Sequence, residues 1–141
     1  MCLLDAVLNW SESAICCRAV NQADPQHPLR AFGRLGAACG IEYAAQAMAV
    51  HGALVAADDA GPSHGYLVSV RSVALHVVRL DDLPGEIRID AERVSGDRST
   101  VLYRFALSHD GRKLIDGRAA IVLDAGGLAA SRSASGREPA S

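Results

Sequence analysis

Three polar side chains near the start of one long apolar segment have the types and spacing for acid–base chemistry. Glu42 is the only carboxylate in the segment Ile41–Ala57, and Gln46 follows it by four residues, which places both on one face of a helix. His27 lies fifteen positions before Glu42 and precedes a proline, which keeps it out of any helix. A histidine and a carboxylate that meet can act as base and acid in a reaction that moves two protons.

Each of these residues also has a structural interpretation. A carboxylate in the first turn of a helix stabilises the helix dipole, and a histidine in a long loop is often exposed to solvent. His51 lies nine residues after Glu42 and therefore on the opposite side of a helix, so we interpret it as structural. The residue types alone leave both interpretations open for His27 and Glu42.

The apolar segment Ile41–Ala57 is predicted to be a helix, because Ala, Met, Leu, Gln and Glu favour helices and no proline interrupts it. Its 17 residues include Glu42, Gln46 and His51, whereas a bilayer needs about 20 predominantly apolar residues. We therefore expect a helix that protein surrounds on nearly all sides, and no membrane partner.

Segments typical of strands lie on both sides of this helix in the sequence. They are Leu3–Leu8 and Ala14–Val20 before it, and Tyr66–Leu80, Glu86–Ser95, Thr100–Ser108 and Lys113–Asp124 after it. Asp110-Gly111 is a strong hairpin signal between the last two, and Asn9–Ser13 is predicted to be a turn. This order predicts one α+β domain over residues 1–124, with an antiparallel sheet wrapped around one central helix. The remaining residues 125–141, rich in Gly, Ala and Ser, are predicted to be a disordered tail.

Composition argues against several functions. The net charge is −2 and aromatic residues are 4% of the chain, so nothing indicates nucleic-acid binding. The four cysteines show no zinc-ligand spacing and need no disulfide framework, which fits a reducing, cytoplasmic setting. The glycines match neither a P-loop nor a dinucleotide motif. We expect no metal and no organic cofactor.

The motifs around His27 and Glu42 resemble the 3-hydroxyacyl-ACP dehydratases of fatty-acid synthesis, whose loop histidine leads into a helix that begins E-x-x-A-Q. The stretches CGIEYAAQAMAVHGAL and GYLVSVRSVALHVVRLDDLPG are similar to the dehydratase-like proteins of aryl polyene and related clusters. The resemblance covers Leu3 to Leu123. It implies the hot-dog fold, in which a sheet wraps a long helix, and an assembly of two subunits, either a homodimer or a heteromer with another hot-dog subunit. It also implies an acyl carrier protein as the partner that brings the substrate.

By this resemblance, His27 is the general base and Glu42 the general acid, with the histidine of one subunit facing the acid of the other. Gln46 matches a residue that supports the acid. The backbone N–H that polarises the thioester carbonyl falls at Ala37, between Gly36 and Gly40. The implied reaction is dehydration of (3R)-3-hydroxyacyl thioesters to trans-2-enoyl thioesters.

Two alternatives remain open. A thioesterase on the same fold would use Glu42 to activate water. A non-catalytic hot-dog subunit would lend shape to a partner enzyme, which is compatible with two departures from the family pattern: the interval from His27 to Glu42 is one residue longer, and no aromatic residue follows His27. Four arginines either meet an acidic carrier protein or form a solvated face, namely Arg30, Arg34, Arg71 and Arg79.

Overall fold

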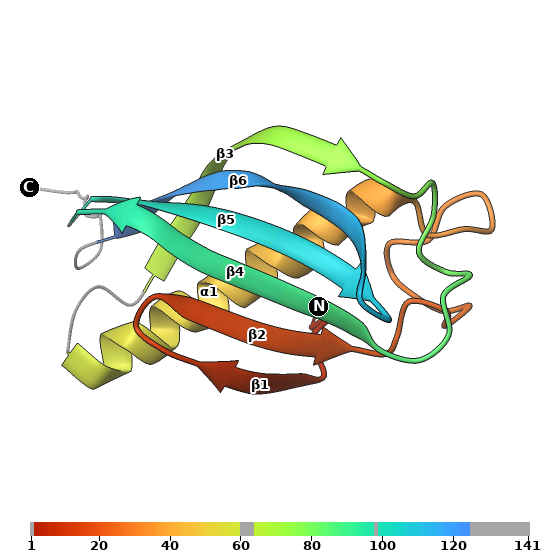
Figure 1. Cartoon of the computed structure of the whole chain (residues 1–141), viewed down its shortest axis with the longest axis horizontal. Coiled ribbons are helices and arrows are strands. Elements are labelled where there is room, and N and C mark those ends of the chain that lie inside the picture. Colours follow the sequence, from red (N-terminus) through yellow and green to blue (C-terminus); the bar gives the residue numbers. More distant parts are fainter. Residues whose placement is uncertain (1, 60–63, 98, 125–141) are drawn as a thin grey trace, which may run out of the picture.

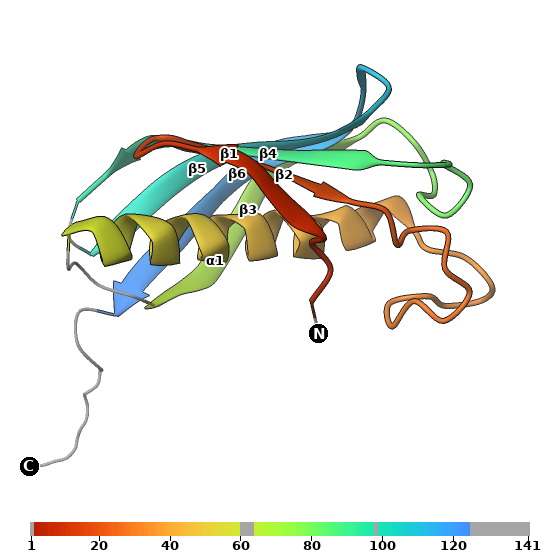
Figure 2. The ribbon, with the colours of Figure 1, turned by 90° about the horizontal axis from the view of Figure 1, so that it is seen from below.

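The computed structural model describes residues 2–59, 64–97 and 99–124. In this part of the chain six strands form one sheet of order β1-β2-β4-β5-β6-β3, and every neighbouring pair is antiparallel (Figure 1). A long helix lies along one face of the sheet (Figure 2). The elements in chain order are β1 (Ala6–Trp10), β2 (Ala14–Ala19), the 3-10 turn η1 (Ala37–Cys39), α1 (Gly40–Asp59), β3 (His64–Leu75), β4 (Ile87–Gly96), β5 (Thr100–His109) and β6 (Arg112–Asp124). The predicted α+β hot-dog architecture is confirmed.

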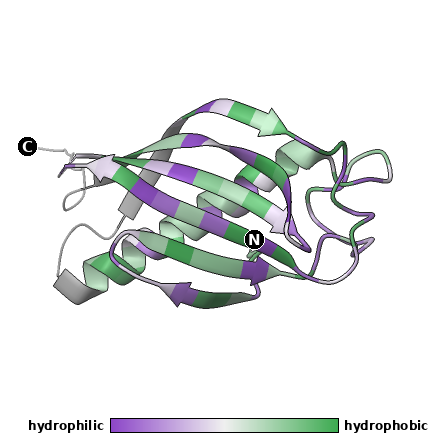
Figure 3. Ribbon diagram, viewed as in Figure 1, coloured by the Kyte–Doolittle hydropathy of each residue, from purple (hydrophilic) through white to green (hydrophobic). Residues whose placement is uncertain are grey.

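Strict alternation along the central strands separates the two faces of the sheet. In β4, Ile87 and Ile89 are buried while Arg88 and Asp90 are exposed, and β5 follows the same rule. Successive side chains of a strand point to opposite faces, so one face packs against α1 and the other carries charged residues. Figure 3 shows this as alternating apolar and polar bands along the strands.

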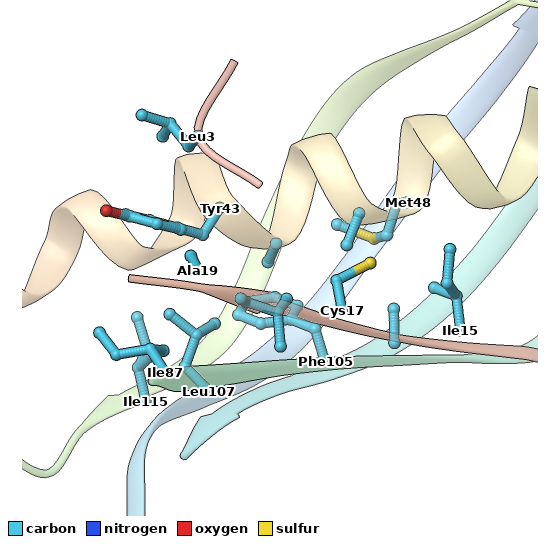
Figure 4. Close-up of a cluster of buried hydrophobic side chains, with 14 of the residues drawn as sticks. Leu3, Ile15, Cys17, Ala19, Tyr43, Met48, Ile87, Phe105, Leu107 and Ile115 are labelled. Carbon is cyan, nitrogen blue, oxygen red and sulfur yellow. The ribbon is translucent and has the colours of Figure 1, made fainter. Parts of the chain in front are cut away.

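Helix α1 contributes a buried row of side chains to this core, including Tyr43, Ala47 and Met48. Figure 4 shows Tyr43 and Met48 within the cluster. The expectation that α1 would be surrounded on nearly all sides is wrong for the single chain. Ala49 and Ala53 are exposed on the side turned away from the sheet. A sheet covers only one side of a helix, so a second layer of protein would be needed to cover the apolar residues on the other side.

Two glycines mark places of close packing, Gly40 where α1 meets the sheet and Gly117 within the sheet. A Cβ on Gly40 would lie 3.1 Å from Leu107 Cδ2 and 3.2 Å from Ile115 Cγ2. A Cβ on Gly117 of β6 would lie 2.9 Å from Phe105 Cζ. The first turn of α1, which carries Glu42, is therefore seated directly on β5 and β6.

Several predicted boundaries change. The helix is longer than Ile41–Ala57 and runs from Gly40 to Asp59. Asn9 and Trp10 belong to β1 instead of the predicted turn, because they pair with Cys16 and Ile15 of β2. The predicted strand Tyr66–Leu80 ends at Leu75; Ser72 at a φ of 56° lies where its pairing with β6 shifts register. The predicted disordered tail, 125–141, lies outside the described residues, and the single domain over 1–124 stays a prediction.

Candidate active site

The long connection between β2 and α1 is built from consecutive turns that present His27. The backbone N–H groups of Asp24, His27 and Arg30 each donate to the carbonyl three residues earlier, at 3.0–3.1 Å. The Asp24 side chain also accepts from the N–H of Gln26 at 2.8 Å. These local bonds give an irregular segment a defined path, and His27 is only 5% exposed within it.

Both ring nitrogens of His27 have hydrogen-bond partners. Nδ1 lies 3.1 Å from the backbone N–H of Leu29, and Nε2 lies 2.8 Å from the hydroxyl oxygen of Tyr43. Because the Leu29 N–H can only donate, Nδ1 accepts, and the ring proton of neutral His27 is on Nε2. Burial lowers the pKa of His27 below its usual 6.5, so the ring is neutral near pH 7.

Tyr43 passes the interaction on to Asn21. The Tyr43 hydroxyl accepts from His27 Nε2–H and donates to Asn21 Oδ1 at 2.7 Å. The Asn21 amide nitrogen in turn donates to the carbonyl oxygen of Leu3 at 2.9 Å. Burial raises the pKa of Tyr43 well above its usual value of 10, so its hydroxyl keeps its proton and remains a donor.

The backbone of Leu3 and the side chain of Gln46 extend this series of hydrogen bonds to Glu42. The Leu3 backbone N–H donates to Gln46 Oε1 at 2.8 Å, and Gln46 Nε2 donates to Glu42 Oε2 at 3.2 Å. Since Leu3 fixes the amide oxygen of Gln46, the amide nitrogen faces the carboxyl group of Glu42. The predicted neighbours Glu42 and Gln46 are thus in contact, and hydrogen bonds connect them to His27. We call the series His27–Tyr43–Asn21–Leu3–Gln46–Glu42 the site network.

The backbone groups expected to hold a thioester carbonyl are largely engaged. The Ala37 N–H donates to Val78 O at 3.0 Å, so that bond would have to open before Ala37 could bind a ligand. The Gly40 N–H caps η1 by donating to carbonyls within it, and Gly40 itself packs on the sheet. Gly36 forms a β-bridge with Arg79, and its carbonyl accepts from the Cys39 N–H at 3.0 Å, although a Cβ there would meet no atom within 4 Å.

Asp81 anchors the His27 loop to the segment after β3. Its carboxylate accepts from Arg79, including an Nε bond of 3.0 Å, and from the Leu35 N–H at 3.0 Å. Arg30 Nη2 lies 3.7 Å from the same carboxylate. Arg79 is the main reason that the pKa of Asp81 is well below its usual range. Two of the four arginines are therefore used within the chain, whereas Arg34 is exposed, as is Arg71.

Sequence reasoning missed three members of the site network. Asn21 lies among turn residues and Leu3 acts through its backbone, so neither carries a recognisable motif. Tyr43 directly follows Glu42 in the sequence, and a tyrosine inside an otherwise aliphatic helix was the available signal. In Figure 4 the Tyr43 oxygen points away from the apolar cluster, as expected for a hydroxyl that needs polar partners.

The remaining polar features lie elsewhere. His76 is bound to Asp116 at 2.7 Å on the exposed side. A depression of about 320 Å³ on the outer face of the sheet is lined by strand residues such as Cys16 and Asp90, and none of the predicted site residues lines it. The described residues contain no group of three side chains able to hold a metal ion. Among them there is also no helix with the length and apolarity to cross a membrane.

Comparison with known protein families matches almost the whole chain. The family model described as ApeP-like, ApeP dehydratase, matches residues 1–126. The chain belongs to the ApeP-like family. It is therefore a member of a dehydratase family, and the resemblance inferred from the sequence is confirmed. No curated protein is similar enough in sequence to be counted as a relative of this ApeP-like chain.

Solved structures show the same fold at low sequence identity. The dehydratase heterocomplex ApeI:P from Xenorhabdus doucetiae matches with a TM-score of 0.77 and 22% identity, covering 87% of this chain and 83% of that one. A mutant thioesterase from Pseudomonas aeruginosa matches at 0.64 and 15%, covering 84% and 80%. A hypothetical thioesterase with coenzyme A from Streptococcus pneumoniae matches at 0.63 and 13%, covering 85% of each chain.

Proposed function

We propose that this ApeP-like protein removes water from (3R)-3-hydroxyacyl thioesters carried by an acyl carrier protein, giving trans-2-enoyl thioesters in aryl-polyene-type or fatty-acid biosynthesis. The observation that supports the proposal most directly is the site network. It holds a neutral histidine and a carboxyl group around the first turn of α1, and it does so in a chain of a dehydratase family.

The two groups divide the chemistry. A thioester acidifies its α-carbon, and neutral His27 has the basicity to take that proton near pH 7. The β-hydroxyl leaves as water when Glu42 gives it a proton. Gln46 orients this acid by donating to Oε2, which assigns Oε1 to the substrate. Neither step requires a metal or an organic cofactor.

The proposal includes a second hot-dog subunit, identical or different. Each site would combine His27 of one protomer with the acid of the other, as the family resemblance implies. Two features of the single chain support a partner: α1 leaves apolar residues uncovered, and β3 lies at the edge of the sheet, where strands are usually paired or protected. Exposed Arg34 and Arg71 are the candidates for contact with an acidic carrier protein. The free cysteines support a cytoplasmic location.

One observation favours the alternative of a non-catalytic subunit. The lone pair of His27 that a base needs is on Nδ1, and in the single chain it already accepts the Leu29 N–H. A subunit whose histidine kept this bond in the assembled protein would position a partner's site instead of providing its base.

The test is dehydration of a 3-hydroxyacyl carrier thioester, measured as loss of one water by mass spectrometry, with the protein in its natural assembly. Glu42→Gln is expected to slow the reaction about 10²–10⁴-fold, the range for one positioned acid. His27→Ala is expected to abolish exchange of the substrate α-proton with solvent deuterium. Glu92→Gln is the control, because Glu92 is an exposed carboxylate paired with Arg104 at 3.1 Å.

Other outcomes point to the alternatives. Thioester hydrolysis that depends on Glu42, without dehydration, would indicate a thioesterase. Dehydration by the assembled protein that survives both substitutions would indicate the non-catalytic subunit.

A further inference from the structure

The direction of each hydrogen bond around His27 follows from neighbouring groups that can only donate or only accept. The Leu29 N–H can only donate, so His27 Nδ1 accepts. Asn21 donates through its nitrogen to Leu3 O, so its oxygen is the group that faces Tyr43. The Tyr43 proton therefore goes to Asn21, and the Tyr43 oxygen is left to accept from His27 Nε2–H. One arrangement of protons satisfies all four bonds.

This arrangement decides which nitrogen can do chemistry. We propose that Tyr43, supported by Asn21, is the positioning residue of His27: it accepts from Nε2–H and keeps the ring proton there when the Leu29 N–H moves away, which leaves Nδ1 to take the α-proton of the substrate. The inference rests on the proposed dehydratase function for its chemistry. The tautomer of His27, and its dependence on Tyr43, can be measured without an activity assay.

The Leu29 N–H must move aside for this step. Its bond to Nδ1, at 3.1 Å, is the longest of the four and joins residues two apart in one loop. Tyr43 is fixed on α1, and its ring is fully buried. The side of His27 that faces Tyr43 is therefore the rigid side, and the side that faces Leu29 is the one that can open to substrate.

The proton balance is complete. The Cα–H bond breaks, its proton goes to Nδ1, and its electron pair becomes the second bond between the α- and β-carbons. The bond from the β-carbon to the hydroxyl oxygen breaks with its pair on oxygen, and a proton from the acid of the other protomer, which is Glu42 where the two subunits are identical, makes water. While His27 is doubly protonated, Nε2–H remains bound to the Tyr43 oxygen, which stabilises the cation. The two groups return to their starting states by exchanging a proton through solvent.

The chain offers a matched control for Tyr43. Tyr103 forms a second buried tyrosine–histidine pair, with Oη 2.6 Å from Nδ1 of His51. Tyr43→Phe and Tyr103→Phe each remove one buried hydroxyl next to a histidine. Only Tyr43 contacts His27. An effect that comes from losing a buried hydroxyl in general therefore appears in both variants, whereas an effect on His27 appears only in Tyr43→Phe.

The experiment is ¹⁵N NMR of histidine-labelled full-length protein, with His27 assigned by its loss in His27→Ala. Wild type is expected to show the Nε2–H tautomer at His27. In Tyr43→Phe the buried Nε2–H loses its acceptor, so the second tautomer is expected to appear, while Tyr103→Phe keeps the wild-type pattern. An Nδ1–H tautomer in wild type, or an unchanged tautomer population in Tyr43→Phe, would overturn the inference.

Kinetics provide the second measurement. Tyr43→Phe is expected to lower kcat up to about 100-fold with little change in KM, because misplacing a catalytic group affects the reaction more than binding. Tyr103→Phe should leave kcat unchanged. If Tyr43→Phe turns over like wild type, the positioning role is wrong. If wild type does not dehydrate at all, the proposed function fails, and the NMR result still decides whether Tyr43 sets the tautomer.

Discussion

Nδ1 of His51 lies 2.6 Å from the hydroxyl of Tyr103, and the two rings meet edge to face with centroids 5.6 Å apart. Nε2 of His51 lies 2.8 Å from the carbonyl of Ser11, so the ring proton is on Nε2 and the Tyr103 hydroxyl donates to Nδ1. In the His27 pair the hydroxyl accepts from the histidine instead. His51 thereby connects α1, β5 and the β1–β2 turn, which is a structural role, as its position in the sequence predicts.

The first prediction is that the protein loses stability as the pH falls below about 6.5. Burial lowers the pKa of both His51 and His27 below the usual 6.5. Between the folded and unfolded pKa values the unfolded chain binds more protons, so stability is complete above 6.5 and decreases as the pH falls from there. Urea unfolding at pH 8 and at pH 5.5 measures the difference, and equal unfolding free energies at the two pH values would contradict it.

His51→Ala is the variant that separates the contributions. It should remove part of the pH dependence and lower the unfolding free energy by about 1–3 kcal/mol for each buried partner left without its bond. Turnover should not change, because His51 is not part of the site network. A large loss of kcat in a folded His51→Ala variant would show that its assignment as structural is wrong.

The second prediction compares two glycines of the same helix. Gly40→Ala should cost about 1–3 kcal/mol, because its methyl group would press on Leu107 and Ile115. Gly52→Ala should stabilise the chain by about 0.5–1 kcal/mol, since a Cβ there meets nothing within 4 Å and alanine favours helix. Thermal or urea unfolding gives both values. Loss of stability in Gly52→Ala would mean that another chain lies against that position.

The third prediction concerns a strained turn in the His27 loop. Ala31 and Arg34 form a β-bridge around Phe32 and Gly33, whose φ values are 54° and 77°. Phe32 is 100% exposed, so no packing within the described part of the chain compensates for a bulky residue in the left-handed region. Phe32→Asn should stabilise by about 1 kcal/mol, since asparagine tolerates this conformation. A destabilised or dissociated assembly would show instead that a partner covers the ring.

The fourth prediction is that Asp81 keeps the His27 loop in place. Asp81→Asn weakens the bonds to Arg79 and Arg30 by removing the charge. Amide hydrogen exchange should then increase over residues 24–35, with lower turnover and a lower unfolding free energy, because a carboxylate whose pKa is lowered in the folded state stabilises that state. Asp97→Asn is the control, because Asp97 is exposed and accepts hydrogen bonds from Ser99 and Thr100 of its own turn. Equal protection of the loop in wild type and Asp81→Asn would refute this role.

The fold was predictable because its elements carry strong local patterns. An uninterrupted run of helix-forming residues predicted α1, and the alternation in β4 predicted which of its residues face the core. The end of β3 was not predictable, because the apolar residues Val77 and Val78 continue the pattern of the strand. In the structure the left-handed backbone of Ser72 lies where the pairing with β6 shifts register, and the strand ends shortly after it, at Leu75. Local sequence sets the type of an element, whereas its end depends on pairing with distant strands.

The candidate site was also predictable only in part. Glu42 and Gln46 were predictable as neighbours from helical spacing alone. The contact between His27 and Tyr43, and that between Asn21 and Leu3, depend on how a long irregular loop folds back on the helix. No periodicity encodes such contacts, and they became visible only with the structure.

The connection between the two halves of the site network passes through the peptide groups of Leu3, one accepting from Asn21 and the other donating to Gln46. Every residue except proline offers the same two groups, so this connection survives most side-chain changes and would be invisible in a comparison of related sequences. It responds instead to how the first residues are held. A peptide fused ahead of Leu3 would act on the acid and the base together, which makes the placement of a purification tag a variable in any activity measurement on this protein.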